Sequence, residues 1–249
     1  MSRLILVRHG QSKWNLSNRF TGQIDVSISK RGIAQCLYLG KKIKDLDLDC
    51  GFSSCLNRSK ETLSIILSQT KRSGVYIDES VDGLRIKEKY ISNLSDIPIY
   101  TNCLLNERDY GLLEGMDKNE ARDKYGEKKV LAWRRSFVAK PPRGESLQDV
   151  YARAIPFFQK RIVSLLKTGK NVIISAHGNS LRAIIKYIEN ISDDKIASLE
   201  IYTGQMIVYH FEKGKFVSKL HKLSFERPIT WKKLGKIFKP RSILNGGKR

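Results

Sequence analysis

The segments LILVRHGQS (residues 4–12) and NVIISAHGNS (residues 171–180) end in the same way. Each is a short apolar run that closes on histidine, glycine, a polar residue and serine, and such a run is typical of a strand buried on both faces. The chain has four histidines, and two of them, His9 and His177, occupy these matched settings. We therefore expect two buried strands, each presenting a histidine at its carboxyl end.

Strands and helices alternate along the rest of the chain. The expected helices cover residues 30–44, 58–69, 118–124, 127–137, 147–167 and 180–190. The expected strands cover residues 3–7, 51–54 and 171–175, followed by a hairpin over residues 205–220 with its turn at Lys213-Gly214. Pro156 should kink its helix, and residues 74–98 are interpreted as an irregular excursion. This alternation predicts an α/β fold with three layers, a mostly parallel central sheet flanked by helices.

Length and composition set the domain count. A chain of 249 residues with 41% apolar content can bury one full core, so we expect one main domain over residues 1–225 and a basic tail over residues 226–249. The four cysteines form no C-x-x-C pair and are interpreted as free thiols in a reducing compartment. No apolar run approaches the roughly 18 residues that span a bilayer, and we expect neither a signal peptide nor a membrane anchor. A cytoplasmic location follows.

The net charge of the chain limits the classes of molecule that it is expected to bind. A formal net charge of +21 would suit nucleic acid, an anionic membrane surface or a cleft for phosphorylated small molecules. The basic residues are spread along the chain, and no RNP-like motif, zinc finger or recognition helix accompanies them. We therefore expect a small phosphorylated partner, and neither nucleic acid nor a membrane.

The two histidines are predicted to meet. In an open α/β sheet, ligands bind beyond the carboxyl ends of the strands, so neighbouring parallel strands would place both imidazoles at one rim. A lone histidine there is more often structural, but two in matching frames favour a site. A metal would need a further ligand at suitable spacing, and a serine nucleophile would need a G-x-S-x-G elbow; the sequence has neither. A neutral imidazole can attack phosphorus, and Arg8 and Arg58 are placed to bind the phosphoryl oxygens.

Several longer strings carry a family resemblance. VRHGQSKWN with FTG, LNERDYG, WRRSF before a double proline, and AHGNSLRAIIKYI resemble the cofactor-dependent phosphoglycerate mutases of the histidine phosphatase superfamily, over Leu4 to about Phe211. The resemblance implies interconversion of 3-phosphoglycerate and 2-phosphoglycerate through phospho-His9, primed by 2,3-bisphosphoglycerate and without a metal. It also implies a homodimer or a dimer of dimers. The basic tail would then suit a mobile cap over the site, and it would equally suit a solvated end.

The same resemblance implies roles for individual residues. The catalytic group comprises the phosphorylated His9, the general acid/base Glu107, and the phosphate pocket of Arg8, Arg58 and His177. The contacts to the rest of the substrate and to its phosphates comprise Asn15, Thr21, Gly22, Tyr110, Lys118, Arg134, Arg135, Gly178 and Asn179. Gln23 and Asp109 depart from the residues common in the family, and the chain between Arg58 and Glu107 is longer than usual.

Two other functions compete with this interpretation. A metal-independent histidine phosphatase of small phosphoesters would use the same nucleophile with water as the acceptor. A basic binding protein that has lost catalysis would keep the fold alone. The pair Arg134-Arg135 favours the mutase, because a reacting molecule that must present either hydroxyl needs a grip on its distal anions.

Overall fold

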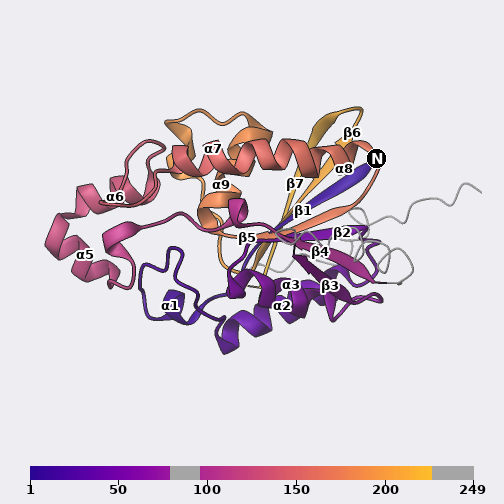
Figure 1. The fold of residues 1–249 in the computed structure, drawn as a ribbon, viewed down its shortest axis with the longest axis horizontal. Helices are drawn as coiled ribbons and strands as arrows, with labels where there is room; N and C mark the ends of the chain where they lie inside the picture. The colour runs from indigo at the N-terminus through magenta and orange to yellow at the C-terminus, as the bar shows by residue number, and fades with distance from the viewer. Residues whose placement is uncertain (79–95, 226–249) are drawn as a thin grey trace, which may run out of the picture.

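The central feature of the fold is a twisted sheet. The structure is a computed structural model and describes residues 1–78 and 96–225. In the described part of the chain the sheet has the strand order β3-β4-β2-β5-β1-β6-β7 (Figure 1). The strands are β1 (Ser2–Arg8), β2 (Cys50–Ser53), β3 (Gly74–Asp78), β4 (Ile97–Thr101), β5 (Val172–Ala176), β6 (Gln205–Glu212) and β7 (Lys215–Ser224). Strands β1 to β5 pair in parallel, and β6 and β7 add an antiparallel hairpin beside β1.

Helices cover both faces of this sheet. One face carries α2 (Lys30–Ile43) and α3 (Asn57–Leu67), and the other carries α7 (Leu147–Phe157), α8 (Ser164–Lys167) and α9 (Gly178–Glu189) (Figure 1). The helices α1 (Lys13–Leu16), α5 (Lys118–Tyr125) and α6 (Glu127–Arg135) lie beyond one end of the sheet. The predicted three-layer α/β class is therefore confirmed. No helix of the described residues is long and apolar enough to cross a membrane.

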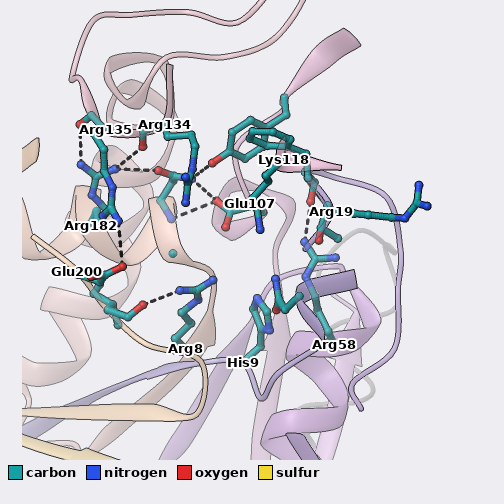
Figure 2. A pocket seen from close by; sticks show the side chains of 18 of the residues that line it. Arg8, His9, Arg19, Arg58, Glu107, Lys118, Arg134, Arg135, Arg182 and Glu200 are labelled. Carbon is teal, nitrogen blue, oxygen red and sulfur yellow. Dashed lines mark hydrogen bonds and ion pairs between the residues drawn. The ribbon is translucent and has the colours of Figure 1, made fainter. Parts of the chain in front are cut away.

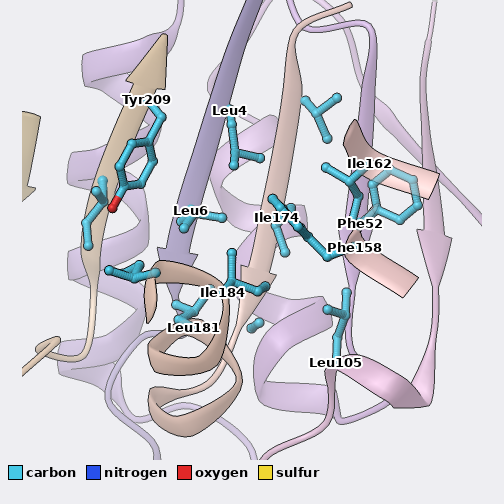
Figure 3. Close-up of a cluster of buried hydrophobic side chains, with 14 of the residues drawn as sticks. Leu4, Leu6, Phe52, Leu105, Phe158, Ile162, Ile174, Leu181, Ile184 and Tyr209 are labelled. Atoms are coloured by element: carbon cyan, nitrogen blue, oxygen red, sulfur yellow. The ribbon is translucent and has the colours of Figure 1, made fainter. Parts of the chain in front are cut away.

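Strand β1 is buried on both faces, as its unbroken apolar sequence predicts. Leu4 and Leu6 point into the cluster beneath α7 and α9 (Figure 3), whereas Ile5 and Val7 join the cluster beneath α2 and α3. All four side chains are fully buried. At about 1.5–3 kcal/mol for each buried aliphatic side chain, this strand ties the two helical layers to one sheet.

Capping residues set where the helices begin. Ser29 accepts a hydrogen bond from the N–H of Gly32 at the start of α2. Ser146 forms a reciprocal capping box with Asp149 at the start of α7. The long helix predicted over residues 147–167 is continuous, but a π-helical stretch over Phe158–Val163 follows Pro156. Proline lacks an N–H, so the hydrogen-bond ladder shifts at this point.

The expected irregular excursion over residues 74–98 is wrong at its two ends. Its first residues form β3, and its last two residues begin β4, which lies between β3 and β2. Gly74 and Pro98 weaken the strand pattern, since glycine has no side chain to pack and proline cannot donate to the ladder. Residues 79–95 lie outside the described residues.

The expectation that all four cysteines are free thiols is wrong for two of them. Cys55 and Cys103 form a disulfide, with their Cα atoms 5.0 Å apart, whereas Cys36 and Cys50 are buried and free. The two bonded residues are 48 positions apart in the sequence, and no local spacing indicates the bond. They meet because each follows the carboxyl end of a strand, and those strands, β2 and β4, are parallel neighbours.

The disulfide closes a long loop and should stabilise the fold. We expect Cys103→Ser, or reduction of the wild type, to lower the free energy of unfolding by about 2–4 kcal/mol, because the crosslink restricts the unfolded chain. Urea titrations with and without reductant measure the difference. In Cys103→Ser itself, reductant should have no further effect. Equal midpoints for oxidised and reduced wild type would contradict the prediction.

Candidate active site

The two histidines meet at the carboxyl ends of β1 and β5. Arg8 pairs with Ala176 in the parallel register, and the next backbone N–H, that of His9, donates to the Ala176 carbonyl at 3.0 Å. The ring centroids of His9 and His177 are 5.0 Å apart. The prediction that both imidazoles lie at one rim of the sheet is confirmed.

His9 presents a lone pair to the pocket. Its Nδ1 lies 2.8 Å from the carbonyl oxygen of Gly10, and a carbonyl only accepts, so the proton is assigned to Nδ1 and Nε2 is unprotonated. Burial holds the pKa of His9 well below its usual 6.5, and the nearby charges of Arg58 and Arg8 act in the same direction. The imidazole is therefore neutral at physiological pH and available as a nucleophile.

The imidazole of His177 is held through its Nε2 atom, whereas that of His9 is held through Nδ1. Its Nε2 lies 2.7 Å from the Ser54 hydroxyl, which also accepts from the N–H of Leu56 at 3.2 Å. A hydroxyl can both donate and accept, so this contact fits either neutral tautomer of His177. Nδ1 is buried and has no hydrogen-bond partner among the described residues. Burial, followed by the nearby charge of Arg58, holds the pKa of His177 well below its usual range.

Two arginines flank the histidine pair and are anchored on backbone carbonyls. Arg58 donates to the carbonyls of Gly22 at 2.6 Å and Ile24 at 2.8 Å, and burial lowers its pKa to about 10. Arg8 donates to the Ile201 carbonyl at 2.6 Å. Both groups remain charged at neutral pH. Their Nε atoms are buried without a partner among the described residues, so the site holds donors that an anion could satisfy.

Glu107 is held by one of its two carboxylate oxygens. Oε1 accepts from the backbone N–H of Arg108 at 2.8 Å, from the backbone N–H of Asn179 at 3.1 Å and from the Asn179 amide at 3.0 Å. No described residue donates to Oε2. The carboxylate is therefore fixed in place through one oxygen, and the other remains available to accept or donate a proton.

An ion pair behind Glu107 fixes the segment that carries it. Arg153 binds Glu145, with Nε to Oε1 at 2.9 Å. The same guanidinium donates to three carbonyls of the segment, those of Leu104, Asn106 and Glu107, at 2.7, 3.0 and 3.1 Å. The position of Glu107 is therefore supported by a side chain of α7 on the far side of the segment.

A second group of cations lies across the pocket from His9. Figure 2 shows His9, Arg8 and Arg58 on one side, Lys118 and the pair Arg134-Arg135 on the other, and Glu107 between them. Lys118 begins α5, and the arginine pair ends α6. These three side chains are half-buried, and burial lowers the pKa values of Lys118 and Arg134.

Nearly all the residues predicted from the sequence line this one pocket. They are Arg8, His9, Asn15, Thr21, Gly22, Arg58, Glu107, Tyr110, Lys118, Arg134, Arg135, Gly178 and Asn179. His177 is absent from the lining and packs beside His9. The described residues contain no group of three or more histidine, cysteine, aspartate or glutamate side chains that could hold a metal ion.

The pocket also contains residues that the sequence did not single out. They are Arg19, Phe20, Arg182, Leu199, Glu200 and Ile201. Arg182 donates to the carbonyls of Arg134 and Arg135 at 3.4 and 2.8 Å, so it fixes the end of α6. Arg19 directly precedes the FTG string, and Phe20 is its first residue. Arg182 lies within AHGNSLR, whereas nothing in the sequence marks Glu200.

Comparisons with known proteins agree with this geometry. The family model described as "Histidine phosphatase superfamily (branch 1)" matches residues 4–84 and 88–224. A 2,3-bisphosphoglycerate-dependent phosphoglycerate mutase from Methanosarcina acetivorans is 44% identical over 234 residues, covering 87% of this chain and 94% of the relative. A protein of the same name from Chlamydia muridarum is 45% identical over 222 residues, covering 87% and 96%.

Solved structures show the same fold at lower sequence identity. YhfR from Bacillus stearothermophilus has a TM-score of 0.71 and 24% identity, covering 88% of this chain and 96% of that chain. A mycobacterial glucosyl-3-phosphoglycerate phosphatase has a TM-score of 0.69 and 21% identity, covering 89% and 98%. The family match and the mutase relatives place this chain in branch 1 of the histidine phosphatase superfamily, among the 2,3-bisphosphoglycerate-dependent phosphoglycerate mutases.

Proposed function

We propose that this protein interconverts 3-phosphoglycerate and 2-phosphoglycerate through phospho-His9, with 2,3-bisphosphoglycerate as the priming donor. The observation that carries the proposal is the two-sided pocket. One group of cations surrounds the nucleophile, a second group lies opposite, and Glu107 stands between them. A substrate with a phosphate at one end and a carboxylate at the other matches this arrangement. The names of the mutase relatives support the same activity.

The pocket fits 2,3-bisphosphoglycerate. Its cationic side chains are Arg8, Arg19, Arg58, Lys118, Arg134, Arg135 and Arg182, and its acidic side chains are Glu107 and Glu200. Thr21, which lines the same pocket, has a buried hydroxyl oxygen without a hydrogen-bond partner among the described residues. A methyl group added to Gly178 would touch the Arg8 guanidinium at 3.5 Å and Glu107 Oε2 at 3.6 Å, so the glycine keeps space open between them. When bound, the bisphosphate supplies the phosphoryl group for His9.

The residues around His9 would stabilise the transferring phosphoryl group. Its Nε2 is the attacking atom, because Nδ1 is engaged with the Gly10 carbonyl. Arg8, Arg58 and His177 would stabilise the phosphoryl oxygens, with Asn15 and the Thr21-Gly22 turn as further contacts. These donors are already oriented by the fold, so little reorganisation opposes the reaction.

The residues across the pocket would handle the rest of the substrate. Glu107 Oε2 would take the proton from the attacking hydroxyl and return it to the leaving one. Tyr110 and Asn179 adjoin Glu107, with the tyrosine hydroxyl 3.3 Å from the amide nitrogen. Lys118, Arg134 and Arg135 would grip the distal anion while the substrate presents either hydroxyl. A phosphatase of small phosphoesters would need no such grip, which is why we prefer the mutase.

The remaining expectations belong to the same proposal. Residues 1–225 form the catalytic unit, and residues 226–249 would provide a cap. Ser224 pairs with Gln205, and the preceding N–H, that of Gly204, donates to the His9 carbonyl at 3.0 Å, so the tail begins near the site. The tail itself lies outside the described residues. A homodimer or tetramer and a cytoplasmic location also remain predictions.

His9 can be tested as the nucleophile. His9→Gln should abolish labelling of the protein by phosphoryl donor and lower mutase turnover by at least about a thousandfold, because the variant lacks the imidazole nitrogen that would take the phosphoryl group. The assay supplies 3-phosphoglycerate, trace 2,3-bisphosphoglycerate and EDTA, and follows 2-phosphoglycerate against free phosphate. His210→Gln, outside the pocket, is the control and should keep activity. Labelled His9→Gln, or phosphate release without isomer from wild type, would contradict the proposal.

The proposed binding of the substrate's distal anion by Lys118, Arg134 and Arg135 can be tested separately. Arg134→Gln should lower mutase kcat/KM by about tenfold to a hundredfold, the value of one charged hydrogen bond, and should affect hydrolysis of the phosphoenzyme much less. Hydrolysis needs only water, so it does not depend on the distal anion. Lys128→Gln removes an exposed cation from the same helix and should change neither rate. Equal losses in both reactions of Arg134→Gln would argue against a distal role.

The buried neutral histidines predict acid sensitivity. The folded protein keeps His9 and His177 unprotonated, whereas the unfolded chain protonates them below the ordinary pKa of 6.5, so the free energy of unfolding falls as pH drops below 6.5. Each histidine contributes up to about 1.4 kcal/mol per pH unit. Urea titrations from pH 7.5 to about 5 measure the slope. The double variant His9→Gln/His177→Gln should flatten it; an unchanged slope would show that neither group is responsible.

A further inference from the structure

The acidic side chain of Glu200 faces the cations that lie across the pocket from His9, namely Lys118, Arg134 and Arg135, which we call the distal cations. Glu200 lines the pocket, and its Oε1 accepts a hydrogen bond from Arg135 Nη2 at 2.9 Å (Figure 2). It lies in the connection that leads into β6, on the opposite side of the arginine from α6. The hydrogen bond from Arg135 lowers the pKa of Glu200, so its carboxylate is charged at neutral pH.

Arg135 is the distal cation that already has an acidic partner. The side chains of Lys118 and Arg134 make no hydrogen bond or ion pair with any described residue, although the Lys118 ammonium lies 5.9 Å from the centre of the Phe20 ring. The Arg182 guanidinium already donates hydrogen bonds to backbone carbonyls and to the Asn179 side chain. A ligand anion that approaches the distal side therefore finds two available cations and one that it must share with Glu200.

We propose that Glu200 is a specificity-determining residue, which competes with the ligand's distal anion for Arg135 and weakens the binding of bisphosphates more than that of monophosphates. This inference rests on the proposed function. Repulsion from a fixed carboxylate grows with the charge of the ligand, and 2,3-bisphosphoglycerate carries one phosphate more than 3-phosphoglycerate. The pocket thereby limits how strongly the primer competes with substrate, while the cations around His9 still bind either molecule.

The ion pair could instead serve to position Arg135, and the two roles predict opposite results. Glu200→Gln keeps an oxygen that can accept from Arg135 and removes only the negative charge. If the charge competes with ligand, the variant binds anions more tightly. If the charge is needed to hold Arg135 in place, the variant binds them less tightly or equally.

Calorimetric titration of the full chain tests this directly. All samples carry His9→Gln, so that bound ligand is not consumed, and the ligands are 2,3-bisphosphoglycerate and 3-phosphoglycerate at low ionic strength. Glu200→Gln is expected to tighten the bisphosphate by about tenfold and the monophosphate by about threefold, with both gains shrinking in added salt. Glu212→Gln removes the same charge from the far end of β6 and should change both by less than about twofold.

The outcomes separate this inference from the proposed function. Equal gains for both ligands, weaker binding in Glu200→Gln, or a similar gain in Glu212→Gln would overturn the role of Glu200. Turnover of 3-phosphoglycerate by the chain with His9 intact is measured in parallel. If that turnover is absent while the binding difference is present, the proposed mutase activity is wrong and the charge discrimination stands.

Discussion

The site depends above all on the parallel register between β1 and β5. Arg8 lies opposite Ala176, and the residue that follows each strand is a histidine. Both strands are buried on both faces, so a slip of one residue would exchange the side chains that face the two helical layers. Hydrophobic packing therefore fixes the register, and the register in turn fixes the 5.0 Å separation of the imidazoles. Stability and chemistry share one constraint.

A second constraint is the free-energy cost of placing several positively charged side chains close together in one buried pocket. Arg8, Arg58 and Arg182 are placed at the pocket by donating to backbone carbonyls, which carry partial rather than full negative charge. Such anchors hold each guanidinium in place without neutralising it. The lowered pKa values of these arginines express the same cost. An anionic ligand would offset this cost by neutralising the guanidinium charges. This explains why buried hydrogen-bond donors converge on the pocket.

The sequence identified the features that local pattern controls. Matched strand endings located His9 and His177, and specific strings located Glu107 and the distal cations. The disulfide between Cys55 and Cys103 could not be found in this way, because it arises from the pairing of two strands. Glu200 was missed for a related reason: a single acidic residue acquires meaning only when the fold places Arg135 beside it. The strands at the ends of residues 74–98 were obscured by glycine and proline.

The same electrostatics would serve both halves of the proposed reaction. In the free protein, burial and two neighbouring guanidiniums favour the neutral form of His9, which is the form that attacks phosphorus. A phosphoryl group on or near His9 brings negative charge, which favours protonation of the neighbouring His177. Nε2 of a protonated His177 can donate to the Ser54 hydroxyl oxygen 2.7 Å away, so this change needs no movement of the imidazole. One set of cations thus keeps the nucleophile neutral before transfer and stabilises the transferred group afterwards.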